Sequence, residues 1–277
     1  MEQQVVVGVD GSARSGIAAD WAAREALRRA QRLRVVHVSP LSAQDLVDVW
    51  PYRPAHLPER SLQVLTAQYP DLRAEGVWLS GPTVPALVAE GTEASVVVLG
   101  THGAGGFAGL SLGSTAEGVA DQCARPVVLV PSGLPADRGA ATERVAVGVD
   151  ARDAADTSIA FAFEAAQRLG GPLHAVHAWS PSSGDAERMP FPMPERDRGE
   201  QEDQEVQLLS DALRPWREKY PRVPILQDVV LFTATQALEW ASARTDLLVV
   251  GRRGRALAPA VHSLLCRTNC PVAVVPS

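Results

Sequence analysis

The stretch Gly100-Thr101-His102-Gly103, followed after nine residues by Gly113-Ser114, decides the fold of this chain. It comes directly after residues 96–99, a short β-branched run that is typical of a buried strand. Residues 115–120 follow it and have the pattern of a helix opening. Glycines at a strand end let the backbone approach a ligand closely, and a serine at a helix start lies beside N–H groups at the positive end of the helix dipole. The stretch therefore predicts a phosphate-binding loop between a strand and a helix.

The chain contains two copies of one sequence pattern, and the copies keep their motifs in the same order. Four segments of the first copy recur in the second: residues 5–10 as 145–150, 33–38 as 173–178, 95–100 as 246–251, and 125–132 as 270–277. A stretch rich in glycine, alanine and proline separates the copies. We predict a first domain at residues 1–132, a linker at 133–143 and a second domain at 144–277.

Short apolar runs alternate with helical patterns within each copy. In the first copy the pattern predicts strands near residues 4–9, 33–38, 73–79, 95–99 and 126–130, and helices near 13–31, 58–68, 83–92 and 113–123. Runs without polar alternation are typical of strands that are buried on both faces, as in a parallel sheet. Because strands and helices alternate, we expect an α/β protein made of two tandem doubly wound domains.

Composition and charge exclude several classes of protein. The 277 residues carry a net charge of −6, which disfavours non-specific binding to nucleic acid. Three cysteines give no disulfide framework and are typical of a reducing compartment. No apolar run approaches the length of a bilayer span, and no basic segment precedes an apolar core at the N-terminus. We therefore expect a cytoplasmic protein that binds neither nucleic acid nor a membrane.

The first predicted strand ends in Asp10-Gly11-Ser12. In a parallel sheet this carboxylate lies at the edge where open α/β folds bind ligands, close to the end of the fourth strand. There it could accept a hydrogen bond from a base amino group or help to hold a metal. The same residues could instead cap the following helix, and the sequence leaves both interpretations open.

These motifs together resemble the universal stress protein family. The resemblance is carried by Val-Gly-Val-Asp-Gly-Ser at residues 7–12, by His37-Val38, by the glycine pattern that ends in Ser114, and by the closing residues 126–131. It covers essentially the whole chain, as a tandem pair of such domains. It implies five parallel strands in the order 3-2-1-4-5 in each domain, flanked by helices, and it implies ATP binding in those members that keep the glycine motif.

Carried over position by position, the resemblance implies a nucleotide site in the first copy. The residues implied for adenine and ribose are Gly8, Val9, Asp10, Val38 and Gly100. The residues implied for the phosphates are Gly103, Gly113, Ser114 and Thr115. Asp10 and the backbone of Val38 would meet adenine, and Gly100 would contact ribose. The implied cofactor is ATP, with Mg²⁺ as an optional companion, and the implied site has no protein-bound metal of its own.

The second copy departs from this pattern. It keeps Asp150, Gly251 and Gly254, but the residues between its second loop glycine and the pre-strand proline number 16 (255–270) against 22 (104–125), a loss of six. The nominal position of the third glycine falls on Leu264, where a side chain would crowd a phosphate. We therefore expect the second copy to bind ATP weakly or not at all.

Several other polar residues carry weaker expectations. His37 and His177 are paired by the repeat, and we expect both to be packed, hydrogen-bonded core residues. His102 lies inside the glycine loop, where it could touch a phosphate or ribose. Residues 197–205 are rich in acids and predict the exposed start of a helix. Three arginines of the second loop are expected to be solvated, with anion binding as the alternative: Arg252, Arg253 and Arg255.

The leading functional hypothesis is an ATP-binding universal stress protein with a regulatory or stress-adaptation role. Nucleotide occupancy would then alter a partner surface or the proline-rich loop at residues 39–57. The alternatives are a slow ATPase that uses the same site, with Asp10 or a bound metal organising water, and a structural adaptor with two vestigial sites. The sequence shows no triad or dedicated base, and the glycine loop carries neither lysine nor arginine, so at most slow ATP hydrolysis is expected.

Assembly is predicted from the apolar terminal strands at residues 127–130 and 272–275. Such strands would lie at sheet edges, and exposed edges invite pairing. We expect these two strands to pair with each other inside the chain, which gives an intrachain pseudo-dimer. An unidentified protein partner and a homo-oligomer are both compatible with the sequence.

Overall fold

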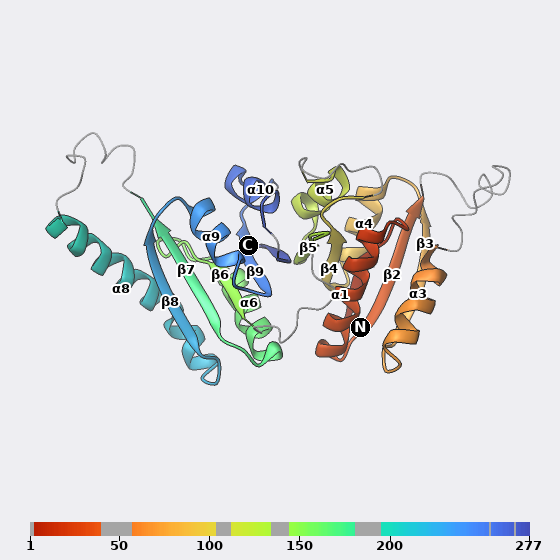
Figure 1. Cartoon of the computed structure of the whole chain (residues 1–277), viewed down its shortest axis with the longest axis horizontal. Coiled ribbons are helices and arrows are strands. Elements are labelled where there is room, and N and C mark those ends of the chain that lie inside the picture. Colours follow the sequence, from red (N-terminus) through yellow and green to blue (C-terminus); the bar gives the residue numbers. More distant parts are fainter. Residues whose placement is uncertain are drawn as a thin grey trace. The chain divides into compact units, whose positions relative to one another are not determined.

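A computed structural model of the chain describes residues 3–39, 57–103, 112–133, 144–180, 195–254, 256–268 and 270–277. It divides into two compact units (Figure 1). Unit one contains residues 1–139 together with 252–276, and unit two contains residues 140–251 together with residue 277. The C-terminal segment at 252–276 thus packs in the same unit as the first sequence copy.

Unit one is built on a sheet whose strands run in the order β3-β2-β1-β4-β5-β10. The strands are β1 (Gln4–Gly8), β2 (Arg32–Ser39), β3 (Ala74–Ser80), β4 (Ala94–Gly100), β5 (Val127–Val130) and β10 (Val272–Pro276). The pairs among β1 to β5 are parallel, whereas β10 pairs antiparallel with β5. The central strands are apolar on both faces, and Val5, Val6 and Val7 are fully buried, because helices cover both sides of the sheet.

The helices of unit one are α1 (Ala13–Arg29), α3 (Leu57–Gln68), α4 (Thr83–Gly91), α5 (Ser114–Gln122) and α10 (Pro259–Leu265). The pair α1 and α3 covers one face of the sheet, and the pair α4 and α5 covers the other (Figure 1). Ser12 fixes the start of α1, because its side chain accepts a hydrogen bond from the N–H of Ser15. The turn between β1 and α1 is thereby held in one conformation.

Unit two repeats this plan with the strands β6 (Val145–Gly148), β7 (Leu173–Trp179), β8 (Ile225–Leu231) and β9 (Leu247–Arg252). Its helices are α6 (Asp156–Leu169), α8 (Glu195–Lys219) and α9 (Ala234–Ser242). The helices α6 and α8 pack together on one face, where the fully buried ring of Phe163 stacks on Tyr220 at 5.4 Å, while α9 packs against β6 and β7. Among the described helices, none is both long and apolar enough to cross a membrane.

The predicted fold class is confirmed. The predicted strand order 3-2-1-4-5 is found as β3-β2-β1-β4-β5 in the first copy and as β8-β7-β6-β9-β10 in the second. The predicted pairing of the terminal strands is also confirmed, since Ala273 of β10 lies opposite Val128 of β5. The boundaries of the two domains stay a prediction. Residues 134–143 of the linker, residues 40–56 of the first proline-rich loop and residues 181–194 of the second lie outside the described residues.

Candidate functional site

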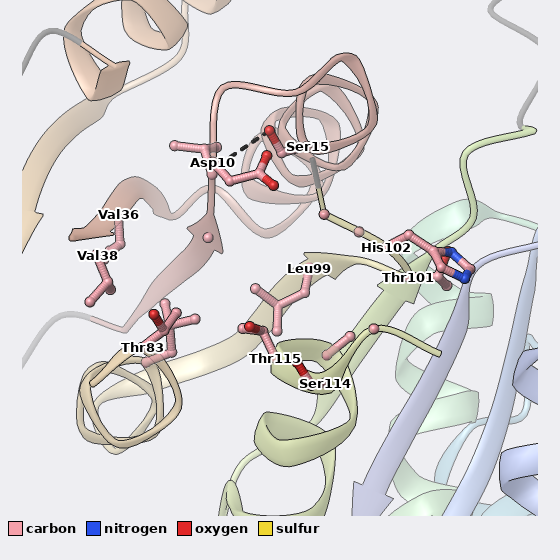
Figure 2. A pocket seen from close by; sticks show the side chains of 17 residues that line it. Asp10, Ser15, Val36, Val38, Thr83, Leu99, Thr101, His102, Ser114 and Thr115 are labelled. Carbon is pink, nitrogen blue, oxygen red and sulfur yellow. Dashed lines mark hydrogen bonds between the residues drawn. The ribbon is translucent and has the colours of Figure 1, made fainter. Parts of the chain in front are cut away.

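A pocket of about 500 Å³ opens in unit one at the carboxyl ends of β1, β2 and β4 (Figure 2). Residues of β2, the loops that follow β1 and β4, the helix α4 and the first turn of α5 line it. Every site residue predicted from the sequence lies on this lining: Gly8, Val9, Asp10, Val38, Gly100, Gly103, Gly113, Ser114 and Thr115. The structure thus brings all of them together around one cavity, and their role as ligand contacts stays a prediction.

Asp10 shapes the turn at the end of β1. Its Oδ1 accepts a hydrogen bond from the N–H of Ser12 at 3.0 Å, and its own N–H donates to Oγ of Ser15 at 3.3 Å. Gly11 between them has φ +80°, a conformation that side chains rarely adopt. Because Ser12 provides the cap of α1, the carboxylate of Asp10 is placed on the pocket lining rather than at the helix start.

Gly103 lies directly against Asp10. A Cβ atom at position 103 would stand 2.8 Å from Oδ2 of Asp10, so any other residue here would displace this carboxylate. The carbonyl oxygen of Gly103 accepts a hydrogen bond from Nη1 of Arg14 at 3.3 Å. Sequence reasoning missed Arg14 because it lies on α1 and not in the glycine loop. Its position in the first turn of the helix after β1, at the ligand edge of the sheet, was the signal that could have identified it.

The first turn of α5 forms the donor side of the pocket. Gly113 is the N-cap, and its N–H donates to the carbonyl oxygen of Thr101 at 2.8 Å. A Cβ atom at position 113 would lie 3.1 Å from that same oxygen, so any larger residue would push the helix start and the loop apart by a few tenths of an ångström. No described side chain caps this helix, and the N–H groups of Ser114, Thr115 and Ala116 therefore remain available at the positive end of its dipole.

The pocket has an apolar end and a polar end. Figure 2 shows Val36 and Val38 at one end and Thr101 and His102 at the other, with Asp10 facing the space between them. The imidazole of His102 lies 3.1 Å from Oγ1 of Thr101. His102 lies on the pocket lining, and its predicted contact with a phosphate or ribose stays a prediction.

Gly8 forms part of the pocket floor, and His37 supports it from the core. A Cβ atom at position 8 would approach Cδ2 of Leu99 to 2.5 Å. Nδ1 of His37 lies 2.8 Å from the carbonyl oxygen of Val9, and the His37 ring packs against Trp78 with centroids 4.7 Å apart. His37 is buried, so its predicted role as a hydrogen-bonded core residue is confirmed.

The second copy has a different arrangement at the corresponding strand end. Nδ1 of His177 lies 3.0 Å from the carbonyl oxygen of Val149, which confirms the predicted core role of this histidine too. Its Nε2, however, lies 3.0 Å from Oε2 of Glu205, and Arg152 forms an ion pair with the same carboxylate. Only 1% of Glu205 is exposed, so the prediction that residues 197–205 form an exposed helix start is wrong for this residue. It is buried because α8 turns it inward onto His177.

The helix α10 also corrects a prediction. It begins at Pro259 with Ala258 as its N-cap and spans 7 residues. Leu264 lies near the end of this helix with 1% exposure, so it does not occupy the position of the third glycine. Aligned by their helix starts, Ala258-Pro259 stand where the first copy has Gly113-Ser114. Proline has no N–H group, so this start offers one donor fewer than α5 does.

Arg252 overturns the prediction of a solvated arginine loop. It is 6% exposed, and it donates from Nη1 to the carbonyl oxygen of Asp121 at 2.6 Å and from Nη2 to that of Cys123 at 2.7 Å. Burial raises the pKa of the neighbouring Cys123 thiol, although Arg252 opposes that shift. Arg253 is exposed, as predicted, and Arg255 lies outside the described residues.

Comparison with known proteins gives matches to one family along both copies. The sequence model of the universal stress protein family matches residues 1–131 and 141–276. Universal stress protein Rv2005c of Mycobacterium tuberculosis is 34% identical over 268 residues, which are 91% of this chain and 87% of that protein. Universal stress protein Rv2623 of the same organism is 32% identical over 269 residues, 91% of this chain and 86% of that protein.

Solved structures agree on the fold. The crystal structure of a universal stress protein from Archaeoglobus fulgidus is 16% identical and superposes with a TM-score of 0.64, over 100% of this chain and 99% of that chain. A protein of Pseudomonas aeruginosa that is described as functionally unknown is 12% identical with the same TM-score of 0.64, over 99% of this chain and 92% of that chain. At these identities the likeness concerns the fold alone.

Proposed function

The chain belongs to the universal stress protein family, and from this membership we propose that it is a regulatory protein that binds ATP in its first copy. Members of the family bind nucleotides. The observation that carries the proposal is the pocket of about 500 Å³, on whose lining all the sequence-predicted site residues lie. The cytoplasmic location and the identity of a protein partner stay predictions.

The start of α5 supports the phosphate part of the proposal. An uncapped helix N-terminus presents N–H groups and a positive dipole end, which together favour an anion. The hydroxyl groups of Ser114 and Thr115 add donors on the same lining, and Gly113 lets this helix start approach the loop after β4. Hydrogen bonds to a charged group contribute about 1.5–3 kcal/mol each, so a few such bonds suffice to orient a phosphate chain.

The opposite end of the pocket supports the base part of the proposal. Val36, Val38 and Leu99 offer apolar surface against which a flat base can pack. The carboxylate of Asp10 is an acceptor for the amino group of adenine, and the backbone of Val38 can meet the base edge. Polar groups in small number around an apolar cavity are the usual means of fixing the orientation of such a ligand.

A magnesium ion can accompany the nucleotide without a dedicated protein site. In the described part of the chain, no group of three His, Cys, Asp or Glu side chains is placed to hold a metal ion. Mg²⁺ commonly takes most of its ligands from substrate phosphates and water, so the phosphate chain itself would carry the ion.

Calorimetric titration of ATP into the intact protein tests the proposal. We expect one site per chain, and we expect Asp10→Asn to abolish or strongly weaken binding, because the amide keeps an oxygen for the N–H of Ser12 but replaces the other acceptor by a donor. The matched control is Asp150→Asn in the second copy, where Oδ1 of Asp150 accepts the N–H of Arg152 at 3.2 Å. Two equal sites, sensitivity to the Asp150 change alone, or no binding of any adenine nucleotide would each overturn the proposal.

A further inference from the structure

Residues of the second sequence copy hold the helix whose start lines the pocket. Three of them contact α5: Arg252, Leu257 and His262. All three lie in the segment at 252–276 that packs in unit one. We call these three residues the α5 clamp. They come from the end of β9 and from the shortened loop and short helix that replace the glycine motif in the second copy.

Arg252 holds the C-terminal end of α5. Its guanidinium donates to the carbonyl oxygens of Asp121 and Cys123 at 2.6 and 2.7 Å, and it also bonds the carbonyl oxygen of Gly254 in its own loop. Carbonyl groups at a helix end lack intrahelical partners and form the negative end of the dipole. A buried planar cation that reaches two of them at once therefore ties the end of α5 to the loop after β9.

The other two members of the clamp hold α5 along its length. The N–H of Leu257 donates to Oδ1 of Asp121 at 2.7 Å. Nε2 of His262 lies 3.4 Å from Oε1 of Glu117, in the first turn of α5. Both partners of this last pair are more than a third exposed, so the pair contributes less than the buried contacts of Arg252 do. The clamp nevertheless reaches both ends of the helix.

Thr101 and Arg252 occupy equivalent positions in the two copies, and both contact α5. Gly100-Thr101 in the first copy corresponds to Gly251-Arg252 in the second. The carbonyl oxygen of Thr101 accepts the N–H of Gly113 at the start of α5, and Arg252 donates to the carbonyl groups at its end. The same loop position in the two copies thus supports one helix from its two ends.

We propose that the α5 clamp positions the phosphate end of the pocket, so that the second copy sets the affinity of the first copy for nucleotide phosphates. This inference rests on the proposed function. A helix of nine residues has little stability of its own, so its location depends on the contacts that hold it. The apolar residues at the other end of the pocket, Val36, Val38 and Leu99, lie on β2 and β4 and not on α5. Loss of the clamp should therefore weaken binding of ATP and leave binding of adenosine unchanged.

The test compares Arg252→Met with Arg252→Lys and with the control Arg253→Met, which alters the exposed neighbouring arginine. For each full-length protein, titration calorimetry gives the affinities for ATP and for adenosine, and amide hydrogen exchange reports on α5. We expect Arg252→Met to lower ATP affinity about tenfold, as for the loss of one charge-assisted hydrogen bond, and to speed exchange along α5. Arg252→Lys keeps the charge without the planar fork, so it should rescue part of both losses, while Arg253→Met should behave as the wild type.

Equal losses of ATP and adenosine affinity in Arg252→Met would reduce Arg252 to a general stabilising residue and overturn the proposal. Unchanged exchange along α5 would overturn it as well. If Arg252→Met folds poorly, Arg252→Lys provides the same comparison in a milder form. A wild-type protein that binds no nucleotide refutes the proposed function instead. In that case faster exchange confined to α5 still shows that the clamp holds this helix.

Discussion

The carboxyl edge of the first copy and that of the second share a framework and differ in what lies on it. In both copies a buried histidine places Nδ1 against the carbonyl oxygen of the residue before the aspartate, Val9 in one and Val149 in the other. In the first copy the ring packs on an indole, whereas in the second it bonds the buried carboxylate of Glu205. The two copies therefore share the histidine that supports the strand end, and they differ in the groups that this histidine contacts on its other side.

The helix that follows the fourth strand differs in the same way. α5 starts with glycine and serine and has nine residues, while α10 starts with alanine and proline and has seven. The first start lines a pocket, and residues around the second hold α5 in place. The first copy carries the pocket lining, and the second contributes contacts that hold a helix of the first.

The largest effect is expected from Glu205→Ala, which removes the feature specific to the second copy. The change leaves Nε2 of buried His177 and the guanidinium of Arg152 without their shared carboxylate. A hydrogen bond to a charged group contributes about 1.5–3 kcal/mol, so losing the bonds to both partners should lower the unfolding free energy by about 3 kcal/mol. Urea unfolding followed by circular dichroism measures it, with Glu202→Ala on the exposed face of the same helix as control. Equal midpoints for the two variants would show that the cluster does not stabilise unit two.

A smaller effect is expected from Gly8→Ala and from Gly148→Ala, the equivalent change in the second copy. A Cβ atom at Gly8 would meet Cδ2 of Leu99 at 2.5 Å, and one at Gly148 would meet Cδ2 of Leu238 at 2.9 Å. Each leucine has to move, and overpacking of this kind costs about 1–3 kcal/mol. Leu99 lines the pocket, so only Gly8→Ala should also weaken ATP binding. Calorimetry and thermal unfolding of both variants test this difference, and equal ATP affinity in the two would contradict it.

The smallest effect is expected at two tyrosines that tie helices together. The hydroxyl of Tyr69 donates to Oδ1 of Asp20 at 2.7 Å, while that of Tyr220 lies 3.4 Å from Oε1 of Glu164. Tyr69→Phe should therefore cost about 1 kcal/mol, a typical net value for one hydrogen bond, and Tyr220→Phe should cost less. Denaturant unfolding of the two single variants provides the measurement.

The same tyrosine gives a pH dependence. Burial, helped by the hydrogen bond to Asp20, raises the pKa of Tyr69 to about 12 from an ordinary value of 10.0. Because the folded value is the higher one, the contribution of Tyr69 to stability is complete below pH 10 and is lost as the pH rises toward 12. Ultraviolet absorbance of the phenolate, compared between wild type and Tyr69→Phe, follows this titration. A Tyr69 whose pKa is the ordinary value would show that the hydroxyl is neither buried nor bonded to Asp20 in solution.

Most of the fold could be predicted from the sequence because its signals are local. The apolar runs and helical periods predicted β1 at 4–9 and α1 at 13–31, and the structure has them at Gln4–Gly8 and Ala13–Arg29. The site residues could be collected in the same way, since glycines and an aspartate at strand ends meet at one edge of a parallel sheet. Their ligand remains a prediction.

The features that sequence reasoning missed depend on partners distant in the chain. Arg252 bonds carbonyl groups about 130 positions earlier, and no local pattern distinguishes it from exposed Arg253. Glu205 lies in an acidic run whose members Glu200, Glu202 and Asp203 are exposed, so its burial follows only from the way α8 packs on β7. Leu264 was wrongly assigned to the position of the third glycine because that position was counted forward from Gly254. The six missing residues precede α10, so this helix already begins at Pro259, with Ala258 as its N-cap.

The pairing of β5 with β10 has a consequence for synthesis of the chain. β5 ends at Val130 and β10 begins at Val272, so the ribosome must make almost the whole second copy before this edge can be covered. At roughly 5–20 residues per second the delay is on the order of ten seconds. During that time the apolar edge Val127–Val130 of each nascent chain stands open, and neighbouring chains on one messenger RNA carry the same edge. The order of translation thus makes this strand a place where two growing chains can pair wrongly.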